Sequence, residues 1–342
     1  MTSLFVRACE RQEVERTPVW FMRQAGRYQP EYRQLRKRLS LLDICERPDV
    51  CTEVTLLPVR QLEVDAAILF SDITVPLRAI GIGLDIVENV GPVVAEPLRS
   101  AEDLGRLRTL VPEEDEPYVA AAVRQLVGEL GPVPLIGFAG GPFTLASYLV
   151  EGGPSRNYRR LKGLMWQDPS LFHALMERLA DLTEGHLAAQ ANAGAAALQI
   201  FDSWIGCLSP ADYRRHVLPV MQDLFGRLKA LRVPTIYFGV ETAGLLEAMA
   251  GAGADVIGVD WRVSIGDAAA RIGHELAIQG NLDPALLLAP SDETAQAAKA
   301  ILRAMSGRRG HIFNLGHGVL PETPPDALRR LVEIVRQESL DA

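Results

Sequence analysis

Short apolar runs rich in β-branched residues alternate along the whole chain with longer segments of helical periodicity. Each apolar run has the length and composition of a buried strand. We predict eight strands, near residues 18–22, 66–71, 134–139, 196–202, 234–240, 255–260, 276–280 and 311–316. We predict helices at 48–61, 116–130, 169–192, 209–231, 244–252, 265–273, 291–306 and 324–338. Strands that alternate with helices favour a parallel sheet, and eight such units indicate an α/β protein of the (β/α)₈ TIM-barrel type. Residues 1–342 would then form a single domain.

The interval 73–133 is too long for one helix between two strands. Its segment 90–94, Val-Gly-Pro-Val-Val, predicts an extended insertion at the rim of the barrel. A doubly wound sheet is the second possibility for this alternation. It is the weaker one, because no Gly-x-Gly-x-x-Gly turn follows an early strand.

Composition narrows the functional classes. The formal net charge of −8 argues against a general binder of nucleic acid or of anionic membranes. The chain contains no apolar run of the roughly 18 residues that a membrane span requires, and we expect no signal peptide at its N-terminus. Its four cysteines show no Cys-x-x-Cys spacing, which predicts reduced thiols in a cytoplasmic protein.

The charge reverses locally in residues 16–38, which hold seven basic residues and one acidic residue. Arg23 and Arg27 follow the first predicted strand and lie on either side of Gly26. Two arginines placed in this way can fork toward one anionic ligand. We expect the basic residues from Arg33 to Arg38 to form a solvated helix face.

Polar residues stand where several other predicted strands end. The second strand ends in Asp72, the fourth in Ser203 and the last in His317, and the third runs into a helix that bears Tyr148. In a (β/α)₈ barrel the carboxyl ends of all strands meet at one face, which carries the active site. These side chains are therefore predicted to lie together with Arg23 and Arg27.

The strings around these residues, and one further string, are distinctive. They comprise residues 18–33, Phe-Ser-Asp at 70–72, Gly-Phe-Ala-Gly-Gly-Pro-Phe-Thr-Leu at 137–145, Phe-Asp-Ser at 201–203, Gln-Gly-Asn-Leu-Asp-Pro at 279–284 and Asn-Leu-Gly-His-Gly at 314–318. Together they span nearly the whole chain, and they resemble the uroporphyrinogen decarboxylase family. The resemblance implies an enzyme of haem biosynthesis, a carboxy-lyase that converts the four acetate side chains of uroporphyrinogen III to methyls and yields coproporphyrinogen III. It also implies a homodimer with facing clefts. We expect no cofactor and no metal, because the sequence shows no motif for pyridoxal or thiamine and no metal-ligand spacing.

The resemblance assigns roles that the residues alone leave open. Asp72, by itself a candidate cap for the next segment, matches the family aspartate that binds the central pyrrole N–H groups. Tyr148, by itself a core residue, matches an active-site tyrosine. Ser203 and His317, by themselves a helix cap and a turn residue, match contacts to the substrate.

By the same comparison Arg23, Arg27 and Asp72 are the predicted catalytic residues. Gly140, Gly141 and Gly318 are expected to shape loops. At position 141 many members carry alanine, so we expect glycine to loosen that loop slightly. We expect structural roles for five further residues: Trp20, Asp202, Asp260, Trp261 and His311.

The implied reaction needs an electron sink, which a ring-protonated pyrrole can itself provide. A carboxylate under the ring nitrogens would stabilise the positive charge that develops there. An arginine paired with the reacting acetate would hinder its loss, so Arg23 and Arg27 should position the other carboxylates unless one of them is the proton donor. The sequence leaves the identity of that acid open.

Two rival functions remain at this stage. A zinc-dependent methyltransferase on the same barrel needs Cys and His ligands at strand ends, but residues 237–241 read Tyr-Phe-Gly-Val-Glu and residues 316–318 read Gly-His-Gly. A non-catalytic tetrapyrrole carrier would need only an arginine-lined pocket. The position of Asp72 argues against a carrier.

Overall fold

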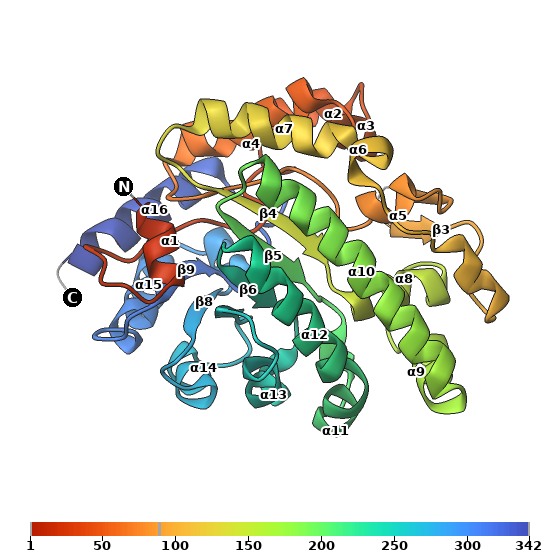
Figure 1. The fold of residues 1–342 in the computed structure, drawn as a ribbon. Coiled ribbons are helices and arrows are strands. Elements are labelled where there is room, and N and C mark those ends of the chain that lie inside the picture. Colours follow the sequence, from red (N-terminus) through yellow and green to blue (C-terminus); the bar gives the residue numbers. More distant parts are fainter. Residues whose placement is uncertain (1, 88–89, 341–342) are drawn as a thin grey trace.

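The computed structural model describes residues 2–87 and 90–340. Within these ranges seven parallel strands form one curled sheet in the order β1-β4-β5-β6-β7-β8-β9, and helices pack around it (Figure 1). The strands are β1 (Ala67–Ile68), β4 (Leu135–Gly140), β5 (Ala197–Phe201), β6 (Thr235–Phe238), β7 (Val256–Gly258), β8 (Ala277–Leu282) and β9 (His311–Leu315). Each coincides with a predicted strand, because a parallel strand buried on both faces reads as a continuous apolar run.

The first predicted strand, 18–22, is not a regular strand, but its backbone fills the eighth position of the barrel. On one side the Phe313 N–H donates to the Pro18 carbonyl (2.9 Å) and the Trp20 N–H donates to the Phe313 carbonyl (3.3 Å). On the other side the Asp65 N–H donates to the Val19 carbonyl (2.8 Å). This segment therefore lies between β9 and the approach to β1, and the prediction of a TIM-type barrel is confirmed.

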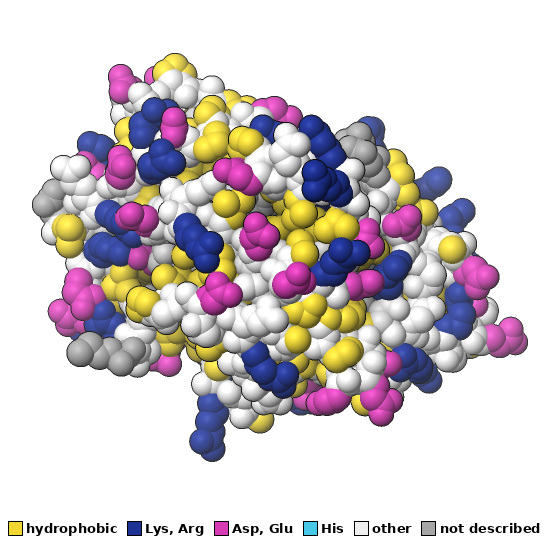
Figure 2. Space-filling view, turned by 90° about the horizontal axis from the view of Figure 1, so that it is seen from above, with side chains coloured by type: hydrophobic (Ala, Val, Ile, Leu, Met, Phe, Trp, Pro, Cys, Tyr) yellow, Lys and Arg dark blue, Asp and Glu magenta, His cyan; other side chains and the backbone are white. Residues whose placement is uncertain are grey.

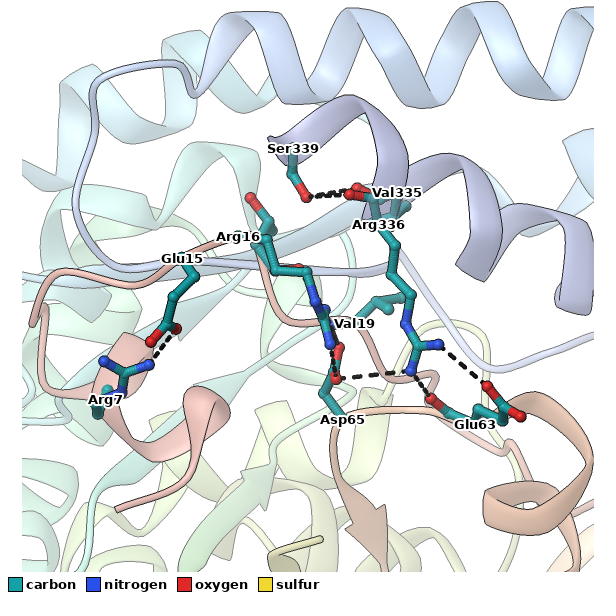
Figure 3. A network of polar contacts seen from close by, with 10 residues as sticks. Arg7, Glu15, Arg16, Val19, Glu63, Asp65, Val335, Arg336 and Ser339 are labelled. Carbon is teal, nitrogen blue, oxygen red and sulfur yellow. Dashed lines mark hydrogen bonds and ion pairs between the residues drawn. The ribbon is translucent and has the colours of Figure 1, made fainter. Parts of the chain in front are cut away.

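A carboxylate holds this closing segment in place. Asp65 accepts hydrogen bonds from the Val19 N–H (2.8 Å) and from both terminal nitrogens of Arg16 (2.7 and 2.5 Å). The interaction raises the pKa of the Arg16 guanidinium. Figure 3 shows Arg336, from the C-terminal helix, reaching Glu63 just before this aspartate in the chain. Chain segments from both ends of the sequence thus meet at the barrel seam.

Most predicted helices are found within a few residues of their expected bounds. They are α4 (Pro48–Leu62), α7 (Pro117–Leu130), α10 (Pro169–Ala193), α13 (Leu246–Ala250), α14 (Ile265–Ile272), α15 (Ser291–Ala304) and α16 (Pro325–Leu340). The helix bearing Tyr148 is α8 (Pro142–Glu151). Short helices that the sequence did not predict are α1 (Leu4–Cys9), α2 (Pro30–Arg36), α3 (Leu41–Cys45), α5 (Val75–Ala79), α6 (Pro112–Asp115) and α9 (Arg159–Gln167).

The helix predicted at 209–231 is interrupted. It consists of α11 (Pro210–Asp212), a π-helical turn over Tyr213–Val217 and α12 (Leu218–Leu228), followed by a 3₁₀ turn. Pro219 explains the change of register, because a proline inside a helix lacks the N–H of the regular ladder and crowds the preceding turn.

The insertion at 73–133 forms an antiparallel hairpin, β2 (Leu84–Val87) and β3 (Gly91–Val94), as well as α5, α6 and α7. The extended segment expected at 90–94 thus lies largely in β3. The Val94 N–H donates to the carbonyl of Gly152, just after α8 (3.0 Å). Figure 1 accordingly shows β3 on the same side of the barrel as α8, the helix that follows the carboxyl end of β4.

The barrel interior includes a short chain of buried polar groups. The Trp20 indole N–H donates to Gln279 (3.0 Å), whose amide in turn donates to Gln199 (3.2 Å). Trp20 therefore has the structural role expected of it. On the face shown in Figure 2, basic and acidic side chains are interspersed. No helix of the described residues is long and apolar enough to cross a membrane.

We expect Asp65→Ala to lower the free energy of unfolding by about 1–3 kcal/mol. The substitution leaves the buried Val19 N–H unpaired and removes the counter-ion of Arg16. Urea denaturation measures the effect. Asp326→Ala is the control, since its pair with Arg329 is solvent-exposed and should contribute less than about 1 kcal/mol. Equal midpoints for the two variants would show that the seam does not depend on Asp65.

Candidate functional site

The proposed site residues come from five places at the carboxyl ends of the strands. Arg23 follows the closing segment, Asp72 follows β1, Tyr148 lies on α8 after β4, Ser203 follows β5 and His317 follows β9. Because all these strands run parallel, their ends share one face of the barrel.

Two glycines allow His317 to be approached from both sides. A Cβ at position 318 would lie 2.4 Å from Cδ of Arg23, and a Cβ at position 316 would lie 2.4 Å from the backbone nitrogen of Trp261. A side chain at either position would force Arg23 or the Trp261 backbone to move. The Arg23 side chain thus packs beside His317, while the Trp261 ring meets the imidazole with its centre 6.4 Å away.

This environment keeps the His317 imidazole neutral. Burial, together with the nearby charges of Arg23 and Arg262, lowers the pKa of His317 to about 4. A neutral imidazole can donate one N–H to a ligand and accept one hydrogen bond. At neutral pH His317 is therefore able to act as a neutral polar contact, and a bound carboxylate would raise its pKa.

Arg23 and Arg27 are exposed, and neither guanidinium has an ion-pair partner within residues 2–87 and 90–340. Arg23 has a left-handed backbone conformation with φ of 58°. The buried Gln24 side chain holds this turn, because it accepts from the Phe21 N–H (3.1 Å) and donates to the Ala66 carbonyl (3.1 Å). The turn thus presents arginines whose charges are available to a ligand.

The two carboxylate oxygens of Asp72 differ in their hydrogen bonding. One accepts from the Thr74 N–H (2.9 Å) and hydroxyl (2.6 Å), directly before α5. The other oxygen accepts no hydrogen bond from the part of the chain described here. The hydrogen-bonded oxygen fixes the side chain, and the second oxygen can accept N–H groups of a ligand.

The charges of both Asp72 and Arg23 act on the phenol of Tyr148. Burial raises the pKa of its phenol to about 12, and among the smaller effects the charge of Asp72 raises it while that of Arg23 lowers it. Tyr148 is therefore a neutral donor within electrostatic reach of both residues. Arg27 is linked to Asp72 in the same way through Tyr32, whose pKa burial raises to about 12 and on which both charges act.

Ser203 is half-buried and directly precedes Trp204. The Trp204 ring meets Tyr148 (6.2 Å between ring centres) and Tyr158 (5.9 Å). The three rings form an aromatic cluster next to the proposed substrate contacts. Sequence analysis did not single out Trp204, although it continues the Phe-Asp-Ser string.

Asp202 has a structural environment, as expected. Its buried carboxylate accepts from the Thr144 N–H (2.9 Å) and hydroxyl (2.7 Å) and from the Tyr237 hydroxyl (3.2 Å), and burial raises its pKa to about 6. A Cβ at Gly141 would lie 2.4 Å from Cγ of Asp202. Glycine at 141 therefore lets this loop pack closely onto Asp202, which is a steric role the expected loosening did not include.

Asp260 is also buried, at 1% exposure, and it holds Arg262 by an ion pair of 2.7 Å. Arg262 was not among the predicted site residues, because nothing in its local sequence indicates the approach of its loop to His317.

In the described part of the chain no three His, Cys, Asp or Glu side chains are grouped as a metal-ion site would require. The predicted residues thus lie close to one another, and their roles remain predictions.

In the described residues, the strand ends of this parallel barrel carry arginines without ion-pair partners, a carboxylate with one free oxygen, and neutral tyrosine and histidine donors. These features define a barrel enzyme suited to a polyanionic ligand. The sequence model of the family described as uroporphyrinogen decarboxylase matches residues 1–338. The chain belongs to this family.

Relatives of known name support this assignment. The chain is 57% identical to a uroporphyrinogen decarboxylase of Streptomyces griseus over 337 residues, which cover 98% of this chain and 92% of the relative. It is 54% identical to a uroporphyrinogen decarboxylase of Thermus thermophilus, with 98% of each chain covered. Among solved structures, a methyltransferase from Methanosarcina mazei superposes with a TM-score of 0.83 at 20% identity, covering 98% of this chain and 99% of that one. That last likeness concerns the fold alone.

We expect the imidazole of His317 to titrate near pH 4 in the free protein, well below its ordinary range. Arg23→Ala should raise this pKa, because it removes a positive charge that disfavours the imidazolium ion. Histidine-selective NMR titration measures both values, and His317→Asn assigns the signal. Arg38→Ala, at an exposed position of the same basic segment, serves as the control. A midpoint at or above about 6.5 in the unsubstituted protein would contradict the proposed environment.

Proposed function

We propose that this chain decarboxylates uroporphyrinogen III, converting its four acetate side chains to methyls and releasing coproporphyrinogen III and carbon dioxide. The observation that carries this function is the family match over residues 1–338. Anaerobic incubation with uroporphyrinogen III, followed by chromatographic counting of the remaining carboxylates, tests it. Recovery of only the octacarboxylate would contradict the proposal.

Asp72 is proposed to stabilise the cationic pyrrole. Protonation of a ring carbon makes the ring an electron sink, and carbon dioxide then leaves the acetate. Protonation of the exocyclic methylene gives the methyl, and loss of the proton from the ring carbon restores the pyrrole. The positive charge on the ring exists only along this path. A carboxylate held rigidly by Thr74, with one oxygen free, favours that charge at little cost in reorganisation.

Arg23 and Arg27 are proposed to hold carboxylates that are not reacting. A guanidinium paired with the reacting acetate would stabilise the starting carboxylate and slow its loss, whereas pairing with its neighbours orients the macrocycle. His317, Ser203 and Tyr148 would add neutral hydrogen bonds to this positioning.

The proposed single domain, cytoplasmic location and homodimer rest on separate observations. One continuous hydrophobic core extends from Phe5 to Val335, which supports a single domain. Cys9, Cys45, Cys51 and Cys207 are all free thiols, which supports a reducing, cytoplasmic location. We infer a homodimer from the family resemblance, and light scattering of the purified protein tests it.

Asp72→Asn should lower the single-turnover rate of decarboxylation by about 10²–10³-fold, the scale of losing one preorganised electrostatic contact. Asparagine retains the size and one acceptor oxygen, so the affinity for a porphyrin analogue should change little. Asp72→Ala should be slower still. Unchanged chemistry together with weakened binding would make Asp72 only an anchor.

Arg23→Ala and Arg27→Ala should each weaken substrate binding by roughly 1.5–3 kcal/mol, the value of a charge-assisted hydrogen bond. Lysine at either position should restore little, since it lacks the planar fork of arginine. Steady-state kinetics on uroporphyrinogen measure the loss. Arg38→Ala is the matched control, and ordinary kinetics in both alanine variants would exclude the proposed role.

A further inference from the structure

A second basic group lies beside His317, on the loop that joins β7 to α14. One terminal nitrogen of Arg262 donates to the Asp260 carboxylate (2.7 Å) and the other pairs with Glu241 (3.2 Å). The guanidinium carbon lies 4.2 Å from the centre of the Trp261 ring, and that ring is the one that meets His317. Arg262 and His317 thus both contact the ring of Trp261.

The loop that carries Arg262 is fixed from several directions. The Asn281 amide donates to the carbonyls of Asp260 (2.9 Å) and Val263 (2.7 Å). The Asp260 carboxylate accepts from the backbone N–H groups of Glu241 (2.6 Å) and Arg262 (3.1 Å) as well as from the guanidinium. Gly316 lets this backbone approach the end of β9, since a Cβ there would lie 3.0 Å from the Asp260 carbonyl carbon. The direction of the guanidinium is therefore set by buried groups.

The two acidic partners of Arg262 differ in exposure. The Asp260 side chain is 1% exposed and the Glu241 side chain is 61% exposed. An exposed ion pair contributes little, because water solvates both charges nearly as well. The nitrogen facing Glu241 can therefore exchange that partner for another carboxylate, while Asp260 keeps the guanidinium in place.

We propose that Arg262 is a further binding residue for a peripheral carboxylate of the substrate, oriented by Asp260 and occupied by Glu241 when no ligand is present. Arg262 and Arg23, which both lie near His317, then bind different carboxylates of the ligand. This inference rests on the proposed function, since it presupposes a ligand with carboxylates around a macrocycle.

Equilibrium binding of uroporphyrin III, a stable octacarboxylate, tests the proposal at low ionic strength. Arg262→Gln should weaken binding about tenfold, because a charge-assisted contact is lost. Glu241→Gln should strengthen binding about two- to fivefold, because it removes the competing carboxylate. The double variant should bind like Arg262→Gln, and added salt should reduce all these differences.

A matched ion pair provides the control. Arg271 and Glu247 are 33% and 48% exposed and join α14 to α13, which carry none of the proposed site residues. Arg271→Gln and Glu247→Gln should leave uroporphyrin binding unchanged. If Arg262→Gln and Glu241→Gln both weaken binding, or neither changes it, the pair serves only the fold and the inference is wrong.

The parallel assay of wild-type decarboxylation separates this inference from the proposed function. An active wild type whose binding is insensitive to Arg262 overturns the inference alone. An inactive wild type overturns the proposed function, and opposite effects of the two substitutions on uroporphyrin binding would still support the carboxylate contact at Arg262.

Discussion

Closure of the barrel by residues 18–20 is the constraint on which the site depends. The Asp65 carboxylate fixes the Val19 N–H at the seam, and three residues later the chain turns at Met22. There the Met22 N–H donates to Asn314 (3.0 Å) and its carbonyl accepts from the Val319 N–H (2.9 Å). These bonds tie the first βα loop to the last one. As a result, Arg23 meets His317 although nearly the whole chain separates them.

The same closure gathers uncompensated positive charge at one end of an acidic protein. Arg23 and Arg27 lack ion-pair partners among the described residues, whereas arginines elsewhere, such as Arg16 and Arg227, are paired with carboxylates. Over the roughly 8–10 Å that salt leaves unscreened, a ligand at the strand ends is affected mainly by these local groups. A net charge of −8 is therefore compatible with binding of a polyanion.

Sequence reasoning located the strands because buried parallel strands are continuous apolar runs, and it placed Asp72, Ser203 and His317 at their ends by counting along the same runs. It missed α3, whose 5 residues are too few to show a period, although it found α13 of the same length, because α13 fills the interval between two strands. It also missed Arg262 and Trp204. Both residues matter only because particular loops lie close together. Glycines such as Gly316 permit that close approach, and the local sequence pattern does not predict it.

Asp72 and Asp202 show why position at a strand end is not enough to mark a reactive carboxylate. Asp202 accepts three hydrogen bonds within the buried barrel wall, so its capacity is satisfied by the fold. Asp72 is held through one oxygen only, and the other is left to a ligand. A group that stabilises a transient cation needs both a fixed position and an unused acceptor. Of the two aspartates, only Asp72 meets both conditions, which supports the role proposed for it.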